Sequence, residues 1–320
     1  MNALMVFTLI NIPKVNRKTI NYLLNVTDIS SLDENDMLSA FIQAKATNKR
    51  IAIPTVESIR TARNKAEEII NETKKQGIGI MTILDEDFPE RLKEINAPPV
   101  LLFYKGNKEC LSEKKSVGII GTRTPTPKGK EIAEKLGSFF AAENFVVVSG
   151  LAKGCDEAGH KGCVEGKGRS IAVLPCELNT IYPSSNKKLA EQILQNGGCL
   201  ISEYPIDTKP NKNYYIQRDR LESALSEALV VVETATSGGT MHTVGFAREQ
   251  NKLIACYKHS SEYLNCKEIE GNQVLIKEEK AIGIYSQNDV LNLKKLILDR
   301  IMNKEHKEED KEVIIQTSMF

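Results

Sequence analysis

Short apolar runs alternate with amphipathic stretches over most of the chain after residue 115. Each run is short enough for a buried strand, and helical spacing follows, as in Ile132, Leu136 and Phe140. Such alternation is typical of a parallel sheet with helices on both faces. The sequence therefore predicts an α/β, doubly wound, mostly parallel sheet, with strands at 117–120, 145–148, 170–174, 200–201, 229–232 and 253–257.

The N-terminal part of the chain is patterned as helices. Segment 10–24 places a turn with Pro13 before a helical stripe that includes Ile20, and segments 36–45 and 56–75 continue the helical spacing. The first segment has the pattern of half a helix-hairpin-helix. Because no glycine-rich hairpin turn is present, a small helical bundle is favoured over a DNA-binding hairpin.

Changes in pattern divide the chain into segments. After the helices, residues 77–107 alternate a strand, a short polar helix and a second strand, and residues 108–115 form a charged connector. We therefore expect a helical domain over 1–76, a strand-helix-strand extension with connector over 77–115, the α/β domain over 116–302 and a charged tail over 303–320.

Small or polar residues follow five of the predicted strands. In an open parallel sheet, ligands bind outside the carboxyl ends of the strands, so these clusters would converge on one rim. Any single cluster is also explained as ordinary turn chemistry, but five together favour a ligand-binding rim. The clusters are Gly121-Thr122-Arg123, Ser149-Gly150, Pro175-Cys176-Glu177, Ser202-Glu203 and Ser237-Gly238-Gly239-Thr240.

The first of these turns suits an anion. The stretch Ser116–Gly129 reads as a strand, a tight turn and a helix N-terminus, which presents backbone N–H groups and the positive end of a helix dipole. Arg123 adds a fixed positive charge with a planar fork of donors. A phosphate is the expected ligand of this turn.

Several cofactor and metal chemistries are excluded by the motifs. The first turn is not followed by the GxGxxG pattern of a dinucleotide site, and no GxxxxGK[ST] phosphate loop is present. His160 and His242 lack partners at metal-ligand spacing, so packing or hydrogen bonding is favoured for both. Asp156 lies at a helix start, where capping or a dipole interaction is the simpler role than catalysis. No cofactor and no metal are expected.

Composition and cysteine usage limit the binding partners and the cellular compartment that we expect for this protein. A net charge of +1 excludes a globally basic protein, so any nucleic-acid contact depends on a local patch. Seven cysteines without a CxxC pair fit neither a disulfide framework nor a zinc site, which indicates a cytoplasmic protein. Residues 4–12 are apolar but lack the flanks of a signal peptide, and no run approaches the roughly 20 apolar residues of a membrane span.

Basic and aromatic residues are interleaved in the segment 211–220, NKNYYIQRDR. This combination suits a single nucleic-acid strand, because cations contact phosphates and rings stack on bases. The alternative is that the tyrosines are core residues and the arginines pair with Asp219 and Glu222. Spacing alone leaves both interpretations open.

A series of motifs resembles the DprA/Smf family of DNA-processing proteins over nearly the whole chain. In order, the motifs are FPERLKEINAPPVLLFYKGN, GIIGTR, SGLAKGCDEAGH, VLPCELNTIYPSSN, LISEYP, YIQRDRLESALSEALVVVET, SGGTMHT and GNQVLIKEEKAIGIYSQNDVL. The resemblance implies a Rossmann-like domain behind an N-terminal helical domain of the SAM or helix-hairpin-helix type. It further implies a homodimer that binds and protects single-stranded DNA, helps to load the RecA recombinase, and catalyses no reaction.

The family's motifs also imply site residues in this sequence. Its glycine-serine-arginine turn corresponds to Gly121, Thr122 and Arg123, and its RNR element corresponds to Arg218, Asp219 and Arg220. Asp219 is a departure that puts negative charge where a phosphate would pass. The expected DNA-binding residues are Gly121, Thr122, Arg123, Ser149, Gly150, Lys153, Tyr182, Asn186, Arg218, Arg220, Ser237, Gly238, Gly239 and Thr240.

Two further points follow from the resemblance. The family often continues into a winged-helix domain, whereas here the charged stretch after residue 302 reads as a solvated tail. The main alternative function is a nucleotide-binding or nucleotide-cleaving enzyme similar to the LOG phosphoribohydrolases, whose PGGxGTxxE motif resembles the stretch beginning at Ser237. DNA binding is favoured because Gly245 stands where that motif has its glutamate, and a hydrolase needs a placed acid or base.

Overall fold

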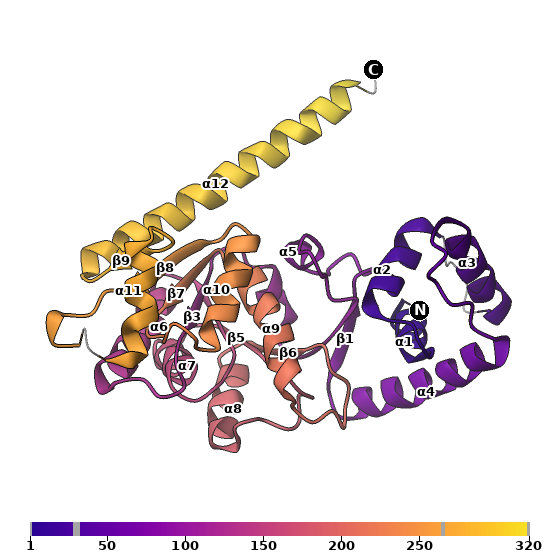
Figure 1. Cartoon of the computed structure of the whole chain (residues 1–320), viewed down its shortest axis with the longest axis horizontal. Coiled ribbons are helices and arrows are strands. Elements are labelled where there is room, and N and C mark those ends of the chain that lie inside the picture. Colours follow the sequence, from indigo (N-terminus) through magenta and orange to yellow (C-terminus); the bar gives the residue numbers. More distant parts are fainter. Residues whose placement is uncertain (1, 28–32, 264–265, 319–320) are drawn as a thin grey trace. The chain divides into compact units, whose positions relative to one another are not determined.

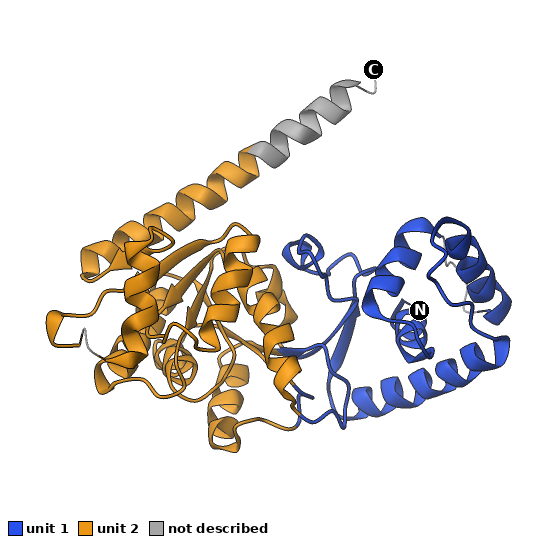
Figure 2. Ribbon diagram, in the orientation of Figure 1, with its two compact units in different colours: residues 1–105, 176–179, 201–209 blue, residues 106–175, 180–200, 210–320 orange. Residues whose placement is uncertain are grey.

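The computed structural model describes residues 2–27, 33–263 and 266–318, with side chains up to residue 306. The chain divides into two units, coloured in Figure 2. Unit 1 comprises Met1–Lys105, Cys176–Asn179 and Ile201–Lys209, and unit 2 comprises Gly106–Pro175, Thr180–Leu200 and Pro210–Phe320. Residues 77–105, expected as part of a separate extension, are grouped with the N-terminal helices in unit 1.

Unit 1 carries the N-terminal helices that the sequence predicts and also α1, which was not predicted. The longest, α4, has the same bounds as the predicted segment and begins at a cap in which Thr55 Oγ1 accepts from Ser58 N at 3.1 Å. Its short strands form an antiparallel pair in which Gly79 lies opposite Tyr104. The elements are α1 (Asn2–Asn11), α2 (Arg17–Val26), α3 (Glu34–Thr47), α4 (Val56–Lys75), β1 (Gly79–Thr82), α5 (Glu90–Lys93) and β2 (Leu101–Gly106).

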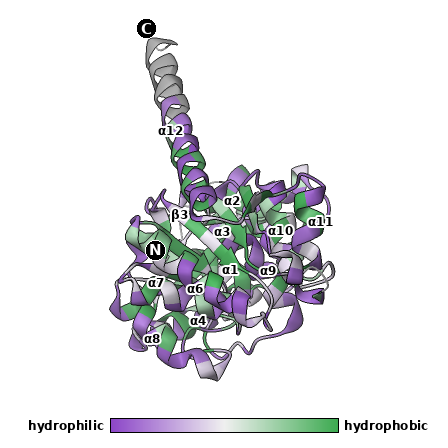
Figure 3. Cartoon of the chain, turned by 90° about the vertical axis from the view of Figure 1, so that its left-hand side faces the viewer, coloured by the Kyte–Doolittle hydropathy of each residue, from purple (hydrophilic) through white to green (hydrophobic). Residues whose placement is uncertain are grey.

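Unit 2 is built on a parallel sheet rich in β-branched residues, and near β3 the ribbon of Figure 3 is largely hydrophobic. Its strands are β3 (Ser116–Ile120), β4 (Val146–Ser149), β5 (Ser170–Val173), part of β6 (Cys199–Ser202), β7 (Ala228–Val231), β8 (Leu253–Tyr257) and β9 (Ile282–Ile284). They lie in the order β6-β5-β4-β3-β7-β8-β9. The predicted mostly parallel, Rossmann-like fold is confirmed. The sequence analysis missed β9, because three residues are too few for a recognisable period.

Helices cover both faces of this sheet, as Figure 1 shows. One face packs against α6, α7 and α12 through a core that includes Phe140, Cys163 and Ile297. The other packs against α10 and α11 through Val244 and Leu275. The helices of unit 2 are α6 (Pro127–Ala142), α7 (Cys155–Glu165), α8 (Lys187–Gln195), α9 (Lys212–Ala224), α10 (Thr240–Glu249), α11 (Glu270–Lys277) and α12 (Gln287–Ser318).

The order of strands places a crevice between β3 and β7. From β3 the chain proceeds through β4 and β5 on one side, and later returns to place β7 on the other side of β3. The loops after these two strands are joined by a backbone hydrogen bond from Thr122 N to Glu233 O, 2.7 Å long. Ligands of doubly wound sheets bind at such a reversal of strand order.

Helix α12 continues beyond the point where the sequence pattern was expected to end. The predicted helical pattern stops at Met302, whereas the helix extends to Ser318 and includes most of the expected charged tail. Lys and Glu are good helix formers, so a charged stretch can extend a helix that is already nucleated. Neither α12 nor any other helix in the described ranges is both long and apolar enough to cross a membrane.

Candidate nucleic-acid interface

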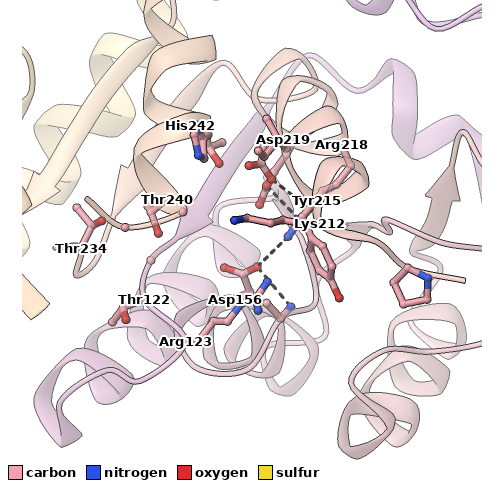
Figure 4. Close-up of a pocket in the computed structure, with 18 of the residues that line it drawn as sticks. Thr122, Arg123, Asp156, Lys212, Tyr215, Arg218, Asp219, Thr234, Thr240 and His242 are labelled. Carbon is pink, nitrogen blue, oxygen red and sulfur yellow. Dashed lines mark hydrogen bonds and ion pairs between the residues drawn. The ribbon is translucent and has the colours of Figure 1, made fainter. Parts of the chain in front are cut away.

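A cavity of about 840 Å³ opens at the carboxyl ends of β3 and β7 (Figure 4). Three groups of loops and helices supply its walls: the turn after β3 with the start of α7, the N-terminal half of α9, and the turn after β7 with the start of α10. We call it the strand-end pocket. Its lining includes Gly121, Thr122, Arg123, Asp156, Tyr182, Lys212, Tyr215, Arg218, Asp219, Glu222, Gly238, Gly239, Thr240 and His242.

The turn after β3 is held tightly against the start of α7. Cys155 N donates to Thr122 O at 3.2 Å, and a β-carbon on Gly121 would lie 2.5 Å from the Cys155 sulfur. Only glycine fits at residue 121 without moving α7, since a separation below 3.0 Å requires a shift. The close approach leaves the next side chains, Thr122 and Arg123, directed to the pocket.

The rim of the strand-end pocket carries exposed cations and aromatic rings. The guanidinium carbon of Arg123 lies 4.9 Å from the centre of the Tyr215 ring, and the Tyr182 ring lies 6.4 Å from that of Tyr215. Lys212 is exposed at the start of α9. Within the described residues neither Arg123 nor Lys212 forms an ion pair, so both charges remain available to an anion.

The floor of the pocket contains a buried ionic cluster around Arg218. The guanidinium lies 3.1 Å from Glu222 Oε2, 3.2 Å from Asp219 Oδ1 and 3.9 Å from Asp156 Oδ2. All four residues are less than a tenth exposed. The alternative in which the arginine pairs with Asp219 and Glu222 therefore describes Arg218, whose charge is directed into the protein.

Three carboxyl groups share one guanidinium, and burial raises the pKa of each. For Asp219, burial outweighs the attraction of Arg218 and raises the pKa to about 7. Asp156 is in addition tied to the preceding loop, because its Oδ2 accepts from Gly150 N and Ala152 N at 3.2 and 3.4 Å. Asp156 thus holds the loop after β4 against α7. It does not cap the helix as expected, because Gly154 is the N-cap and forms no side-chain cap hydrogen bond.

The N-terminus of α6 is occupied by a carboxylate of the protein itself. Buried Glu233 accepts from Thr126 N at 2.7 Å and from Thr126 Oγ1 at 2.6 Å. Gly129 leaves room for this carboxyl, since a β-carbon there would lie 2.3 Å from its carbon atom. The anion expected at this helix start from the stretch 116–129 is therefore supplied internally, and a ligand meets Arg123 and the neighbouring loop instead.

Eight of the fourteen expected DNA-binding residues line the strand-end pocket. They are Gly121, Thr122, Arg123, Tyr182, Arg218, Gly238, Gly239 and Thr240. The other six lie outside its lining: Lys153 and Ser237 are exposed, whereas Ser149, Gly150, Asn186 and Arg220 are buried.

The buried members of the expected set have internal partners. Ser149 Oγ donates to Ile119 O at 2.7 Å, and Asn186 Nδ2 donates to Leu151 O at 3.0 Å. Arg220 is 3% exposed and donates to Gln217 O. These contacts hold the turns around the pocket in place. The buried residues therefore support the site without lining it.

Several pocket residues were noticed in the sequence but not included among the expected DNA-binding residues: Lys212, Tyr215, Glu222 and His242. Lys212, Tyr215, Asp219 and Glu222 are spaced by three or four residues on α9 and therefore share one helix face. This spacing is the signal in the sequence that could have identified these residues as one face of a helix. Of the two histidines considered, His242 is exposed at the pocket, and buried His160 has Nδ1 2.6 Å from Ser170 Oγ, a hydrogen-bonding role of the expected kind.

Comparison with known proteins gives consistent matches. A family model described as DNA recombination-mediator protein A matches residues 79–295. The DNA processing protein DprA of Bacillus subtilis is 33% identical over 228 residues, which cover 71% of this chain and 74% of that protein. These names describe recombination mediation and DNA processing and specify no catalysed reaction, which supports a non-enzymatic role.

Solved structures agree with the sequence matches. The X-ray structure of DNA processing protein A from Streptococcus pneumoniae aligns with a TM-score of 0.65 at 26% identity and covers 87% of this chain and 98% of that one. A structure of the Helicobacter pylori protein, described for its single-stranded DNA binding mode, aligns with a TM-score of 0.61 at 28% identity over 70% of this chain and 96% of that one. Together with its doubly wound fold, these matches show that the chain belongs to the DNA recombination-mediator protein A family, also known as DprA/Smf.

Proposed function

We propose that this protein binds single-stranded DNA at the strand-end pocket and acts in the cytoplasm as a recombination mediator, in transformation, recombination or defence against foreign DNA. The observation that carries the proposal is the rim, where Arg123 and Lys212 lie beside Tyr182 and Tyr215 with no ion pair among the described residues. Cations that contact phosphates and rings that stack on bases are the recurring features of single-strand sites. The H. pylori relative, described for its single-stranded DNA binding mode, supports this assignment.

The DNA contacts in this proposal come from the rim of the pocket rather than from its floor. Arg123 and Lys212 contact phosphates, and Lys153, exposed just outside the cavity, extends the path. Arg218 is excluded from phosphate contact because its guanidinium already faces three carboxyl groups. Gly238, Gly239 and Thr240 of the turn after β7 line the same cavity.

Binding to a fluorescent single-stranded oligonucleotide tests the proposal, with the same sequence as a duplex for comparison. We expect tighter binding to the single strand and a strong decrease of affinity with salt, because phosphate contacts release counterions. Equal affinity for the duplex, or no binding to either, would contradict the proposal.

The mediator role has its own test. We propose that the protein acts as a homodimer that protects single-stranded DNA and loads a RecA-type recombinase onto it. The expected result is faster RecA filament formation on DNA already coated with single-strand binding protein. A protein that binds DNA but leaves filament formation unchanged would retain the first assignment and lose the second. Sedimentation of the free protein measures the dimer directly.

A further inference from the structure

The floor of the strand-end pocket carries an excess of acid. Asp156, Asp219 and Glu222 face the single guanidinium of Arg218, and all four are less than a tenth exposed. The exposed cations Arg123 and Lys212 line the same pocket (Figure 4). A phosphate would be attracted by the cations of the rim and repelled by the carboxyl groups of the floor. The floor therefore faces a different part of the ligand.

Two carboxyl groups of the floor, those of Glu222 and Asp219, are incompletely hydrogen-bonded within the described part of the chain. Glu222 Oε1 is fully buried and has no hydrogen-bond partner, although Oε2 of the same group accepts from Arg218. Asp219 Oδ1 lies 3.2 Å from Arg218 Nε, but that nitrogen forms no hydrogen bond, and no hydrogen bond from the described residues reaches the Asp219 carboxyl. Asp156 differs, because backbone N–H groups satisfy its carboxyl. A buried acceptor without a donor is costly, so a cavity lined by such atoms favours a ligand that supplies N–H groups.

We propose that the pocket floor selects a nucleobase with an exocyclic amino group, and that Asp219 is the specificity-determining acceptor. The inference rests on the proposed single-stranded DNA binding. With the sugar-phosphate chain at Arg123 and Lys212, a base entering between Tyr182 and the start of α10 reaches Asp219 with its hydrogen-bonding edge. Tyr182 is 50% exposed and offers a face for stacking.

The chemistry of the base edges gives the direction of the preference. Cytosine, adenine and guanine carry an amino group whose N–H bonds donate to a carboxylate. Thymine and uracil have carbonyl oxygens on both sides of their one ring N–H, and these oxygens would meet the lone pairs of Asp219. Two facing acceptors leave this carboxylate unsatisfied, which is how polar sites reject an analogue that lacks a donor.

Asparagine at residue 219 provides the matched test of this role. Asp219→Asn keeps the size of the side chain and replaces one acceptor oxygen by an N–H donor, while Arg218 retains Asp156 and Glu222 as partners. Glu249→Gln, on the exposed side of α10, removes the same charge away from the pocket and serves as the control.

The experiment compares oligodeoxycytidine with oligodeoxyuridine, each about 20 nucleotides long, a length that spans a typical single-strand site. These bases differ only in the groups at ring positions 3 and 4. The measurement is made at pH 8, above the pKa of about 7 to which burial raises Asp219. We expect the wild-type protein and Glu249→Gln to bind oligodeoxycytidine about tenfold more tightly. For Asp219→Asn we expect the ratio to fall to about one or to reverse.

The outcomes separate the two proposals. Equal affinity of the wild-type protein for both oligomers would overturn the base selection and leave DNA binding standing. A tenfold ratio that persists in a folded Asp219→Asn variant would overturn the role of Asp219. Failure of the wild-type protein to bind either oligomer would overturn the proposed function and, with it, this inference. Thermal melting of each variant establishes that it is folded.

Discussion

Gly150 lies so close to Arg218 that a β-carbon at residue 150 would come within 1.3 Å of the guanidinium Nη1. The arginine cannot move aside easily, because Glu222, Asp219 and Asp156 surround it at 3.1, 3.2 and 3.9 Å. The glycine of the SGLAKG motif therefore makes room for a buried charge cluster.

This close approach predicts a large decrease of stability for Gly150→Ala. We expect the free energy of unfolding to fall by about 3 kcal/mol or more, because the substitution overpacks a site that also contains buried charges. Thermal or urea unfolding measures the change. Gly239→Ala is the control, since a β-carbon there meets nothing within 4 Å, and it should change stability by less than about 0.5 kcal/mol. Equal stability of the two variants would refute the packing argument.

From the raised pKa of Asp219 we predict that the difference in stability between Asp219→Asn and the wild-type protein depends on pH. Because burial raises its pKa to about 7, the folded state binds a proton that the unfolded state releases near its ordinary value of 3.8. The carboxyl therefore costs stability increasingly as pH rises from about 4 to 7, and the cost is constant above that. Relative to the wild-type protein, Asp219→Asn should gain about 2 kcal/mol between pH 5 and pH 8.

Melting curves at several pH values measure this gain. Glu249→Gln, which replaces an exposed carboxyl away from the pocket, is the matched control. An advantage of Asp219→Asn that shrinks as pH rises would show that the cluster stabilises the ionised carboxylate.

The rim predicts specific changes in the salt dependence of DNA binding. Arg123→Ala, Lys212→Ala and Lys153→Ala should each weaken single-strand binding and reduce the slope of log K against log salt by about one for each phosphate that is no longer neutralised. Their melting curves should match the wild-type curve, because none of these charges forms an ion pair among the described residues. Lys295→Ala, exposed on α12, is the control for removal of a positive charge elsewhere. Unchanged slopes in all three rim variants would remove the rim from the DNA path.

The pocket also predicts the absence of nucleotide hydrolysis. Its carboxyl groups are held at Arg218, and in the alternative enzyme class the catalytic glutamate corresponds to Gly245. Incubation with nucleoside monophosphates should therefore release no free base on chromatography. Release that disappears in Glu222→Gln would reverse this conclusion and assign a catalytic role to the pocket floor.

The local pattern of apolar and polar residues was sufficient to predict most strands of unit 2 and the edge of the sheet at which the pocket lies. The runs after residue 115 became β3 to β8 within one or two residues, because a buried strand needs an uninterrupted apolar run. The parallel topology predicted that five strand-end clusters would converge. Gly121, Arg123 and Gly239 line one cavity, whereas the clusters at 149–150, 175–177 and 202–203 lie outside its lining. Strand β9 and the full length of α12 were not predicted, since neither carries a distinctive period.

The sequence by itself determined most of the strands and helices and the edge of the sheet at which the pocket lies, since spacing along the chain encodes both. Only the tertiary structure decided what each charge does. Arg123 and Arg218 both stood in motifs expected to contact DNA, yet Arg123 is exposed at the rim and Arg218 is 6% exposed among three carboxyl groups. Likewise, Glu233 occupies the start of α6 from 107 residues away along the chain. Burial and the partners of a charge depend on contacts between distant segments, and no local pattern specifies them.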